Sequence, residues 1–543
     1  MKNLRTITAI NILFSIGILY SCKKEEMAVI VPVKPVVVLS EYDPSMVTDF
    51  LKDATDVPLG VAISYEEYTK NGANYVSIIK SEFDNVTFGY QMKHGAIVRN
   101  NGALDFTRCD ELVNLAGMPI FGHVLAWHQN NNGDYLRSLA TGSASSATAP
   151  NLINNGDFEQ GTGNTFTDWS NLVGGNAEGS YAAETTDTEP NTNSKRALKV
   201  TVTKAGTNAY DMQSLGPNFK TVAGKQYRVS VSIKSLTGKG QLKLVVQNSA
   251  YTENQLTFST NTWSNYVWNV TVSEINPQIK LHFNGEGTYL IDNIKVEDVS
   301  LLTPPTNAEI TKKVDAALKT WVQGNVGHYK NKIKAWDAIN EVFTDGTPTL
   351  RTGSSTGDAY YWAQYLGRGY IAKTFKYARE ANPDCDLFVN DYNLESNAAK
   401  LDSTIGLVKE LLSQNIPVTG IGTQMHMSIN TSQAGIVSMF QKMAATGLKI
   451  RISELDISIN PSNTTGFVPT KALYDAQAAM FNFVVKTYIT NVPIAQRHGI
   501  TVWGVSDKDS WITSTFNRPD FPLMWDANFA KKSAYVGFWK GFK

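Results

Sequence analysis

The sequence predicts an α/β protein in which a (β/α)8 barrel is interrupted after its third strand by an antiparallel β-sandwich. Outside residues 150–300, short apolar runs alternate with helical periods, and eight of these runs have the composition of strands, the number that closes a parallel barrel. Within residues 150–300, closely spaced runs alternate apolar and polar residues, as antiparallel sheets do. We therefore expect the barrel over residues 41–145 and 301–543, with the sandwich over 150–300 between its two parts.

The eight barrel strands are expected at short apolar runs spread along the chain. These are residues 59–63, 85–88, 119–126, 333–339, 386–390, 418–423, 449–453 and 499–504. Between them, residues 310–322 and 472–488 have the apolar periodicity of helices. In the middle region Tyr227, Val229 and Val231 alternate with polar residues, as a half-buried strand does. The simplest arrangement places the sandwich in the loop after the third barrel strand, with its two ends close together.

The first 40 residues have the features of a secretory signal and a tether. Lys2 and Arg5 precede an apolar segment over residues 7–19, which is too short for a stable membrane span. The tetrapeptide that ends at Cys22 resembles the lipobox of bacterial lipoproteins, in which the cysteine becomes the lipidated first residue. The resemblance implies a signal peptide over 1–22, a tether over 23–40 and a lipid anchor in the cell envelope, on the outer-membrane surface. The alternative is an unmodified cysteine in a discarded signal.

The overall composition bounds the classes of partner. The formal net charge of the 543 residues is zero, which does not indicate a nucleic-acid partner. The 11 Trp and 23 Tyr suit sugar binding, because an aromatic face packs on the C–H face of a pyranose ring, although aromatic residues also fill cores. Only Cys109 and Cys385 remain after the signal, so no disulfide framework is expected. We expect a monomer whose core stabilises the fold.

Two glutamates follow strand-like runs in the second part of the chain. Glu341 ends the run that begins at residue 333, and Glu454 ends the run that begins at residue 449. Side chains at the C-terminal ends of barrel strands gather at the face where active sites lie. Hydrolysis of a glycosidic bond needs two carboxylates, one to protonate the leaving oxygen and one to attack the anomeric carbon or activate water. A lone glutamate would instead be interpreted as a strand cap or the partner of a nearby cation.

Six motifs occur along the predicted barrel. They are GHVLAWH at 122–128, WDAINE at 336–341, NDYN at 390–393, GTQMH at 422–426, SELD at 453–456 and VWGVSDKDSW at 502–511. By these motifs and their order, residues 41–140 and 301–543 resemble glycoside hydrolase family 10, which consists mostly of endo-β-1,4-xylanases. The resemblance implies retaining hydrolysis of internal xylosidic bonds, through a glycosyl-enzyme intermediate and without a catalytic cofactor.

The resemblance also implies a role for each matching residue. Glu341 is then the acid/base and Glu454 the nucleophile, with their carboxyl groups about 5–5.5 Å apart. Glu341 must hold a proton near neutral pH, whereas Glu454 must stay ionised. Asn340 would bind the sugar 2-hydroxyl, and His426 with Asp456 would orient Glu454. The other residues expected to bind substrate are Lys93, His123, Trp127, Gln424, Trp503 and Trp511.

One motif departs from the family pattern. The family's second strand usually reads Thr-x-Glu-Asn-Glu-Met-Lys, whereas this chain has Gly89 and Tyr90 at the Glu and Asn positions and retains Lys93. Hydrogen bonds to the sugar next to the cleaved one should be lost or replaced by stacking on Tyr90. We therefore expect altered affinity or a preference for decorated chains. His128 could be structural, and a zinc site with His123 lacks a third ligand nearby.

Residues 150–300 resemble carbohydrate-binding modules of families 4, 9 and 22. The segments that carry this resemblance are NLINNGDFE at 151–159 and YLIDNI at 289–294. In those families the two ends of the module meet at a structural calcium, so Glu159 and Asp292 are candidate oxygen ligands, with surface turn residues as the alternative. Trp169, Tyr210 and Trp263 could stack on a glycan or pack in the core.

Three hypotheses of function follow from the sequence. The first is a lipid-anchored endo-β-1,4-xylanase that acts on xylan or xylo-oligosaccharides, with an inserted module that holds the polymer near the cleft. The second is a non-catalytic surface glycan-binding protein that keeps the barrel as a scaffold, although it would not need the paired glutamates. The third is a glycanase that acts on another β-linked polymer, which the fold does not exclude.

Overall fold

The computed structural model describes residues 41–141, 149–190, 192, 194–237, 240–258, 261–301 and 306–543. The expected signal peptide over 1–22, the tether over 23–40 and the lipidation site Cys22 lie outside the described residues. Among the helices of the described ranges, none is both long enough and apolar enough to cross a membrane.

Eight parallel strands close the expected barrel. They are β1 (Leu59–Ile63), β2 (Asn85–Phe88), β3 (Ile120–Ala126), β14 (Ile333–Asn340), β15 (Asp386–Asp391), β16 (Gly420–Thr423), β18 (Lys449–Ser458) and β19 (Arg497–Val502). Each pairs with the next in this order, and β19 pairs with β1, which closes the ring. A short strand, β17 (His426–Ser428), pairs with the end of β18. Each of the eight barrel strands overlaps one expected range, so the prediction of the barrel is confirmed, whereas β17 was not expected.

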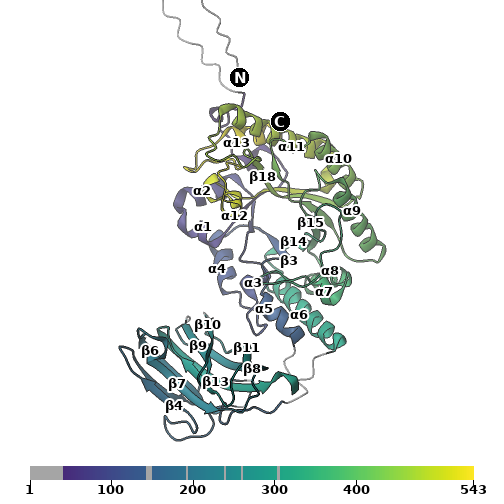
Figure 1. Ribbon diagram of the computed structural model, residues 1–543. Helices are drawn as coiled ribbons and strands as arrows, with labels where there is room; N and C mark the ends of the chain where they lie inside the picture. The colour runs from purple at the N-terminus through teal and green to yellow at the C-terminus, as the bar shows by residue number, and fades with distance from the viewer. Residues whose placement is uncertain are drawn as a thin grey trace, which may run out of the picture. The chain divides into compact units, whose positions relative to one another are not determined.

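Helices surround the barrel strands (Figure 1). They are α1 (Tyr65–Lys70), α2 (Gly72–Glu82), α3 (His94–Ile97), α4 (Thr107–Ala116), α5 (Gly133–Thr141), α6 (Asn307–His328), α7 (Ala363–Leu366), α8 (Gly369–Ala381), α9 (Ala398–Ser413), α10 (Gln433–Ala444), α11 (Lys471–Asn491), α12 (Trp511–Phe516) and α13 (Ser533–Lys540). α6 and α11 contain the two helices expected from periodicity. α6 begins at a capping box, in which the Thr306 hydroxyl accepts from Glu309 N and the Glu309 carboxylate accepts from Thr306 N.

The barrel interior is packed by the strands themselves. All five residues of β1 and all seven of β3 are buried. The fully buried Trp336 of β14 lies so close to Gly122 of β3 that a Cβ at position 122 would be 2.2 Å from the indole. The two cysteines outside the signal, Cys109 and Cys385, are buried and free, so packing rather than a disulfide between them holds the core.

Between α5 and α6, the described residues form two five-stranded antiparallel sheets. Their strands are β4 (Ser170–Val173), β5 (Glu178–Glu184), β6 (Ala197–Lys204), β7 (Met212–Asn218), β8 (Lys225–Ser235), β9 (Gly240–Gln247), β10 (Tyr251–Phe258), β11 (Ser264–Val272), β12 (Gln278–His282) and β13 (Gly287–Asp298). The strand orders are β10-β9-β12-β7-β4 and β11-β8-β13-β6-β5. One hydrophobic cluster takes residues from both sheets, for example Leu244 from the first and Val231 from the second.

The three aromatic residues considered for glycan stacking in this region differ in burial. Trp169 is buried in the cluster shared by the two sheets. Trp263 is buried with Ala197 and Leu290. Tyr210, in contrast, is 54% exposed. Of the three, only Tyr210 presents its ring to solvent.

Candidate active site

A cleft of about 840 Å³ opens at the C-terminal ends of the barrel strands. All of the barrel residues expected at the site line it. They are Tyr90, Lys93, His123, Trp127, Asn340, Glu341, Gln424, His426, Glu454, Asp456, Trp503 and Trp511. The motifs therefore meet at one place, although they lie on separate strands.

Glu341 reaches the cleft from a turn at the end of β14. Its backbone has a φ of 55°, in the left-handed region that residues with a Cβ seldom adopt. Its N–H donates to the Asn390 carbonyl at 2.9 Å, which ties the turn to the end of β15. Such unusual backbone conformations gather at functional sites, where the surrounding structure holds them.

Side-chain amides bridge Glu341 and Glu454. The Asn390 amide donates to Glu454 Oε1 at 3.0 Å and to Asn340 Oδ1 at 2.9 Å. The Gln424 amide donates to Asn340 Oδ1 at 3.2 Å and to Glu341 Oε1 at 3.0 Å. The two carboxylates thus belong to one hydrogen-bonded network and face one cleft.

The surroundings of Glu454 favour its ionised form. His426 lies between two carboxylates, with Nε2 at 3.2 Å from Glu454 Oε2 and Nδ1 at 2.9 Å from Asp456 Oδ2. Burial opposes charge on His426, but Asp456 and Glu454 outweigh it and raise its pKa to about 10. Burial also acts to raise the pKa of Glu454, but the hydrogen bond from His426 and the charge of Lys93 bring that pKa below its ordinary value. Glu454 is therefore a carboxylate at neutral pH, as a nucleophile must be.

A basic and aromatic wall stands beside Glu454. Lys93 Nζ lies 4.4 Å from the centroid of the Trp127 ring, and burial lowers the Lys93 pKa to about 8. His123 Nδ1 lies 2.9 Å from Asp337 Oδ2, and its ring centroid is 5.5 Å from that of Trp503. Donors next to aromatic faces are suited to the hydroxyls and the C–H face of a sugar.

Of the two substituted positions, Gly89 leaves space beside the cleft, whereas Tyr90 places a large ring there. A Cβ at Gly89 would meet only the Ile63 carbonyl oxygen, at 3.7 Å. Tyr90 is 44% exposed and also lines the cleft.

Glu67, which was not expected at the site, lines the same cleft, and burial raises its pKa. Its only sequence signal is the Ser-x-x-Glu capping box that begins at Ser64.

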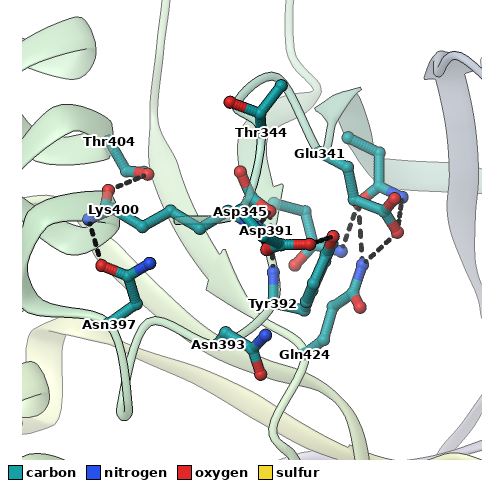
Figure 2. A network of polar contacts seen from close by, with 12 residues as sticks. Glu341, Thr344, Asp345, Asp391, Tyr392, Asn393, Asn397, Lys400, Thr404 and Gln424 are labelled. Atoms are coloured by element: carbon teal, nitrogen blue, oxygen red, sulfur yellow. Dashed lines mark hydrogen bonds and ion pairs between the residues drawn. The ribbon is translucent and has the colours of Figure 1, made fainter. Parts of the chain in front are cut away.

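Other cleft residues were missed as site residues. Asp345, Arg351, Tyr392 and Asn393 line the cleft together with Glu341. Figure 2 shows Asp345, Tyr392 and Asn393 in one view with that residue. Tyr392 and Asn393 belong to a recognised motif, so their position could have been inferred. Asp345 and Arg351 belong to none of the motifs.

His128 also lies beside Glu341. Its Nδ1 is 4.0 Å from Glu341 Oε2, and its ring stacks on Tyr361 with 5.8 Å between the centroids. Burial lowers the His128 pKa to about 3, so the ring is neutral at the pH of most reactions. His128 therefore both packs and borders the cleft.

Glu159 and Asp292 are the two residues expected at a calcium site in the middle region. Asp292, on β13, is fully buried, and its Oδ2 accepts no hydrogen bond from the described residues. Burial, with Glu159 and Glu189 nearby, raises the Asp292 pKa to about 7. Glu159 Oε1 accepts from the backbone N–H groups of Lys195 and Arg196. Within the described residues, no group of three or more His, Cys, Asp or Glu side chains is arranged for a metal ion.

The part of the chain that forms the barrel matches a known protein family. The model of glycosyl hydrolase family 10 matches residues 47–155 and 303–540, which is more than half of the chain. Endo-1,4-beta-xylanase A of Cellvibrio japonicus (strain Ueda107) is 37% identical over 227 residues, covering 39% of this chain and 37% of that protein. Endo-1,4-beta-xylanase A of Phanerodontia chrysosporium is 35% identical over 238 residues, covering 44% of this chain and 53% of that protein. The matches thus span about a third to a half of these relatives.

Solved structures are similar over most of the chain. The family 10 protein of Paenibacillus barcinonensis gives a TM-score of 0.55 at 21% identity, covering 90% of this chain and 96% of that one. Xylanase 10B of Thermotoga maritima gives a TM-score of 0.53 at 17% identity, covering 91% of this chain and 98% of that one. At these identities the likeness shows the fold alone.

Proposed function

The chain belongs to glycosyl hydrolase family 10, and from that premise we propose that it is an endo-β-1,4-xylanase that cleaves internal bonds of xylan with retention of configuration. The observation that carries the proposal is the unequal environment of the two glutamates in one cleft. His426 and Lys93 favour the ionised form of Glu454, whereas Glu341 is joined to it only through neutral amides. A retaining glycosidase needs this division between a nucleophile and a proton donor.

The proposed reaction proceeds in two steps. Glu454 attacks the anomeric carbon while Glu341 gives its proton to the leaving oxygen, which forms a glycosyl-enzyme ester and releases the leaving chain. Glu341, now a carboxylate, takes a proton from water, which attacks the same carbon and releases Glu454. Asn340 Oδ1 accepts from Asn390 and Gln424, and its Nδ2 donates to Glu341 Oε1 at 3.3 Å, which leaves the second N–H of that amide for the sugar 2-hydroxyl.

Product analysis with linear xylan, arabinoxylan and cellulose tests this proposal. We expect xylo-oligosaccharides from the xylans and, in proton NMR of early products, the β-anomer. Failure to release oligosaccharides from any xylan would refute the activity. Early appearance of the α-anomer would refute the retaining mechanism.

A different β-linked polymer is the second candidate, because the cleft departs from the family at one place. Gly89 provides no hydrogen-bonding side chain, and Tyr90 offers an exposed ring instead. These residues favour stacking over hydroxyl recognition next to the cleaved sugar. Faster cleavage of mixed-linkage glucan than of linear xylan would support this candidate. A purely glycan-binding role would require that no polymer is cleaved.

We further propose that residues 150–300 form an inserted β-sandwich that binds carbohydrate. The two antiparallel sheets and their common core support the sandwich. On one sheet, Tyr251 is 46% exposed, and its ring lies 6.1 Å from that of His282, which is 6.4 Å from exposed Tyr210. Affinity electrophoresis in soluble xylan would show retardation that a Tyr210→Ala/Tyr251→Ala variant loses. Equal mobility with and without xylan would refute binding.

We also propose that Asp292 and Glu159 hold a structural calcium. Hard oxygen ligands suit this ion, and the buried Asp292 Oδ2 without a hydrogen-bond partner fits a cation. The ion would stabilise the module and take no part in hydrolysis. The unfolding temperature of EDTA-treated protein should rise when calcium is added, and Asp292→Asn should abolish this rise. Identical unfolding with and without calcium would refute the site.

Finally, we propose that the protein is a monomer anchored to the outer membrane through lipid on Cys22. The tetrapeptide that ends at this residue supports the lipid anchor. Radiolabelled palmitate should enter the wild type and not a Cys22→Ser variant, and protease treatment of intact cells should release the enzyme. Light scattering of protein without residues 1–22 would give its oligomeric state.

A further inference from the structure

Lys400 is a buried cation near the active-site cleft that the proposed mechanism does not use. It lies in the first turn of α9, and its side chain is 0% exposed. Its Nζ is 2.9 Å from Asp391 Oδ1 and 3.2 Å from Asp345 Oδ1, and it lies 3.4 Å from the centroid of the Tyr392 ring. Figure 2 shows this lysine extended toward the two aspartates. The ammonium therefore contacts two chain segments, the loop after β14 and the end of β15.

Hydrogen bonds connect this contact to the catalytic acid. Tyr392 OH donates to Asp345 Oδ2 at 2.5 Å and accepts from Arg351 Nη2 at 2.9 Å. Arg351 Nε in turn donates to the carbonyl oxygen of Glu341 at 3.1 Å. On the other side, the Asp391 carbonyl accepts from Gln424 N at 3.0 Å. Lys400 therefore contacts Asp345 and Asp391, and hydrogen bonds lead from each of these two residues to Glu341.

The segments that Lys400 joins form one wall of the cleft. Asp345, Arg351 and Tyr392 line the cleft, and they follow or flank Glu341 rather than Glu454. In a retaining mechanism the acid stands on the side of the leaving group, because it protonates the departing oxygen. This wall therefore borders the part of the substrate that leaves in the first step.

We propose that Lys400 is a positioning residue, which fastens the loop after β14 to the end of β15 and so holds the leaving-group wall of the cleft in place beside Glu341. The inference rests on the proposed glycanase function. Without the ammonium, Asp345 and the Tyr392 ring lose their common partner. The wall can then move, which weakens binding of leaving-group sugars. Attack by Glu454 on a substrate without such sugars needs no contact with this wall.

A purely structural role for Lys400 makes a different prediction. The buried carboxyl of Asp391 would be left unpaired by Lys400→Met, which destabilises a protein irrespective of substrate. The double variant Lys400→Met/Asp391→Asn removes both charges and avoids that penalty. Asp345→Asn weakens the same link from a side chain that is 54% exposed, so it should fold whatever happens to the buried pair.

The test compares two substrates. Xylohexaose places sugars on both sides of the cleaved bond, whereas para-nitrophenyl β-xylobioside has a good leaving group and no leaving sugar. For the double variant we expect kcat/KM on xylohexaose to fall about tenfold or more, mostly through KM, because displaced contacts to bound sugars cost rate steeply. Activity on the aryl substrate should stay within about twofold, and Asp345→Asn should show the same split, reduced to about threefold.

The control is Lys442→Met, which breaks an exposed ion pair with Asp402, 2.6 Å long. It should leave both substrates unchanged. An equal loss on both substrates, or no loss on either, in a folded double variant and in Asp345→Asn would overturn the inference. A wild type that cleaves neither substrate would instead refute the proposed function, and this inference with it.

Discussion

At the scale of single residues, the charge on His426 organises the side of the site that holds Glu454, the proposed nucleophile. The ring lies between Glu454 and Asp456, and Asp456 also accepts from Trp511 Nε1 at 2.7 Å. A neutral imidazole could donate to only one of the two carboxylates, whereas the charged ring donates to both. The charged ring is therefore what keeps Glu454 ionised and pointed into the cleft.

The pH dependence of stability tests this charge. The folded-state pKa of His426 is about 10, against 6.5 for a free histidine. Its stabilising contribution is therefore fully present below about pH 6.5 and is lost as the pH rises toward 10. Urea unfolding would measure the free energy of unfolding of the wild type and of a His426→Asn variant. The difference between the two should shrink over this pH range. His328→Asn, at an exposed histidine, is the control, and a constant difference for His426→Asn would contradict the assignment.

The role of Glu341 makes a second prediction at this scale. Removing a general acid typically costs about 10²- to 10⁴-fold, so Glu341→Ala should lose about that much on xylan. On an aryl xylobioside the first step needs little protonation, and azide should restore turnover and give a β-glycosyl azide as product. Glu454→Ala should show no such rescue to a β-product. Restoration of Glu454→Ala instead of Glu341→Ala would reverse the two roles.

At the scale of elements, the packing of β3 against β14 brings together the motif of His123 and the motif of Glu341, the proposed acid. β3 carries His123, and β14 ends just before Glu341. The two strands pair in parallel, with Trp336 opposite Gly122. Only a residue without Cβ leaves room for that indole, so the glycine sets the spacing of the strands.

The contact between Gly122 and Trp336 predicts that a methyl group at position 122 destabilises the protein. Gly122→Ala places a Cβ 2.2 Å from the Trp336 ring, and overpacking of this kind costs about 1–3 kcal/mol in the free energy of unfolding. Gly89→Ala, where the nearest atom is 3.7 Å away, is the matched control and should be nearly neutral. Thermal and urea unfolding would measure both. Equal stability of the two variants would show that the strands adjust.

At the scale of the whole molecule, the barrel closes across the inserted segment. β3 and β14 are neighbours in the barrel, where Ile120 pairs with Ile333, although both antiparallel sheets lie between these strands in the chain. The barrel core contains residues only from before and after the two antiparallel sheets, and those sheets have a core of their own. Each core can therefore be filled without the other.

Deletion of residues 150–300 tests this independence. With a short Gly/Ser connection between α5 and α6, the barrel should remain folded and should hydrolyse xylohexaose at close to the wild-type rate, because every residue lining the cleft is retained. Activity on insoluble xylan should fall if the module holds polymer. Circular dichroism and both assays would measure this, and an insoluble product would show that the sheets belong to the barrel's fold.

Much of this protein could be predicted from short stretches of its sequence. The barrel strands were found because each is a buried run of apolar residues, which is a local property. Glu341 and Glu454 were found because each stands at the end of such a run within a motif. Even the long interruption was visible, because the alternation of residues changes from one period to another.

The tertiary structure decided what depends on partners distant in the chain. Trp169 and Trp263 are buried whereas Tyr210 is exposed, a difference that the sequence left open for all three. Lys400, Asp345 and Arg351, which connect through Tyr392 to Glu341, belong to no motif, because Lys400 meets the others only when the barrel closes. Burial, charge and hydrogen bonding at a site are sums over neighbours in space, and the linear sequence contains those neighbours without showing which of them meet.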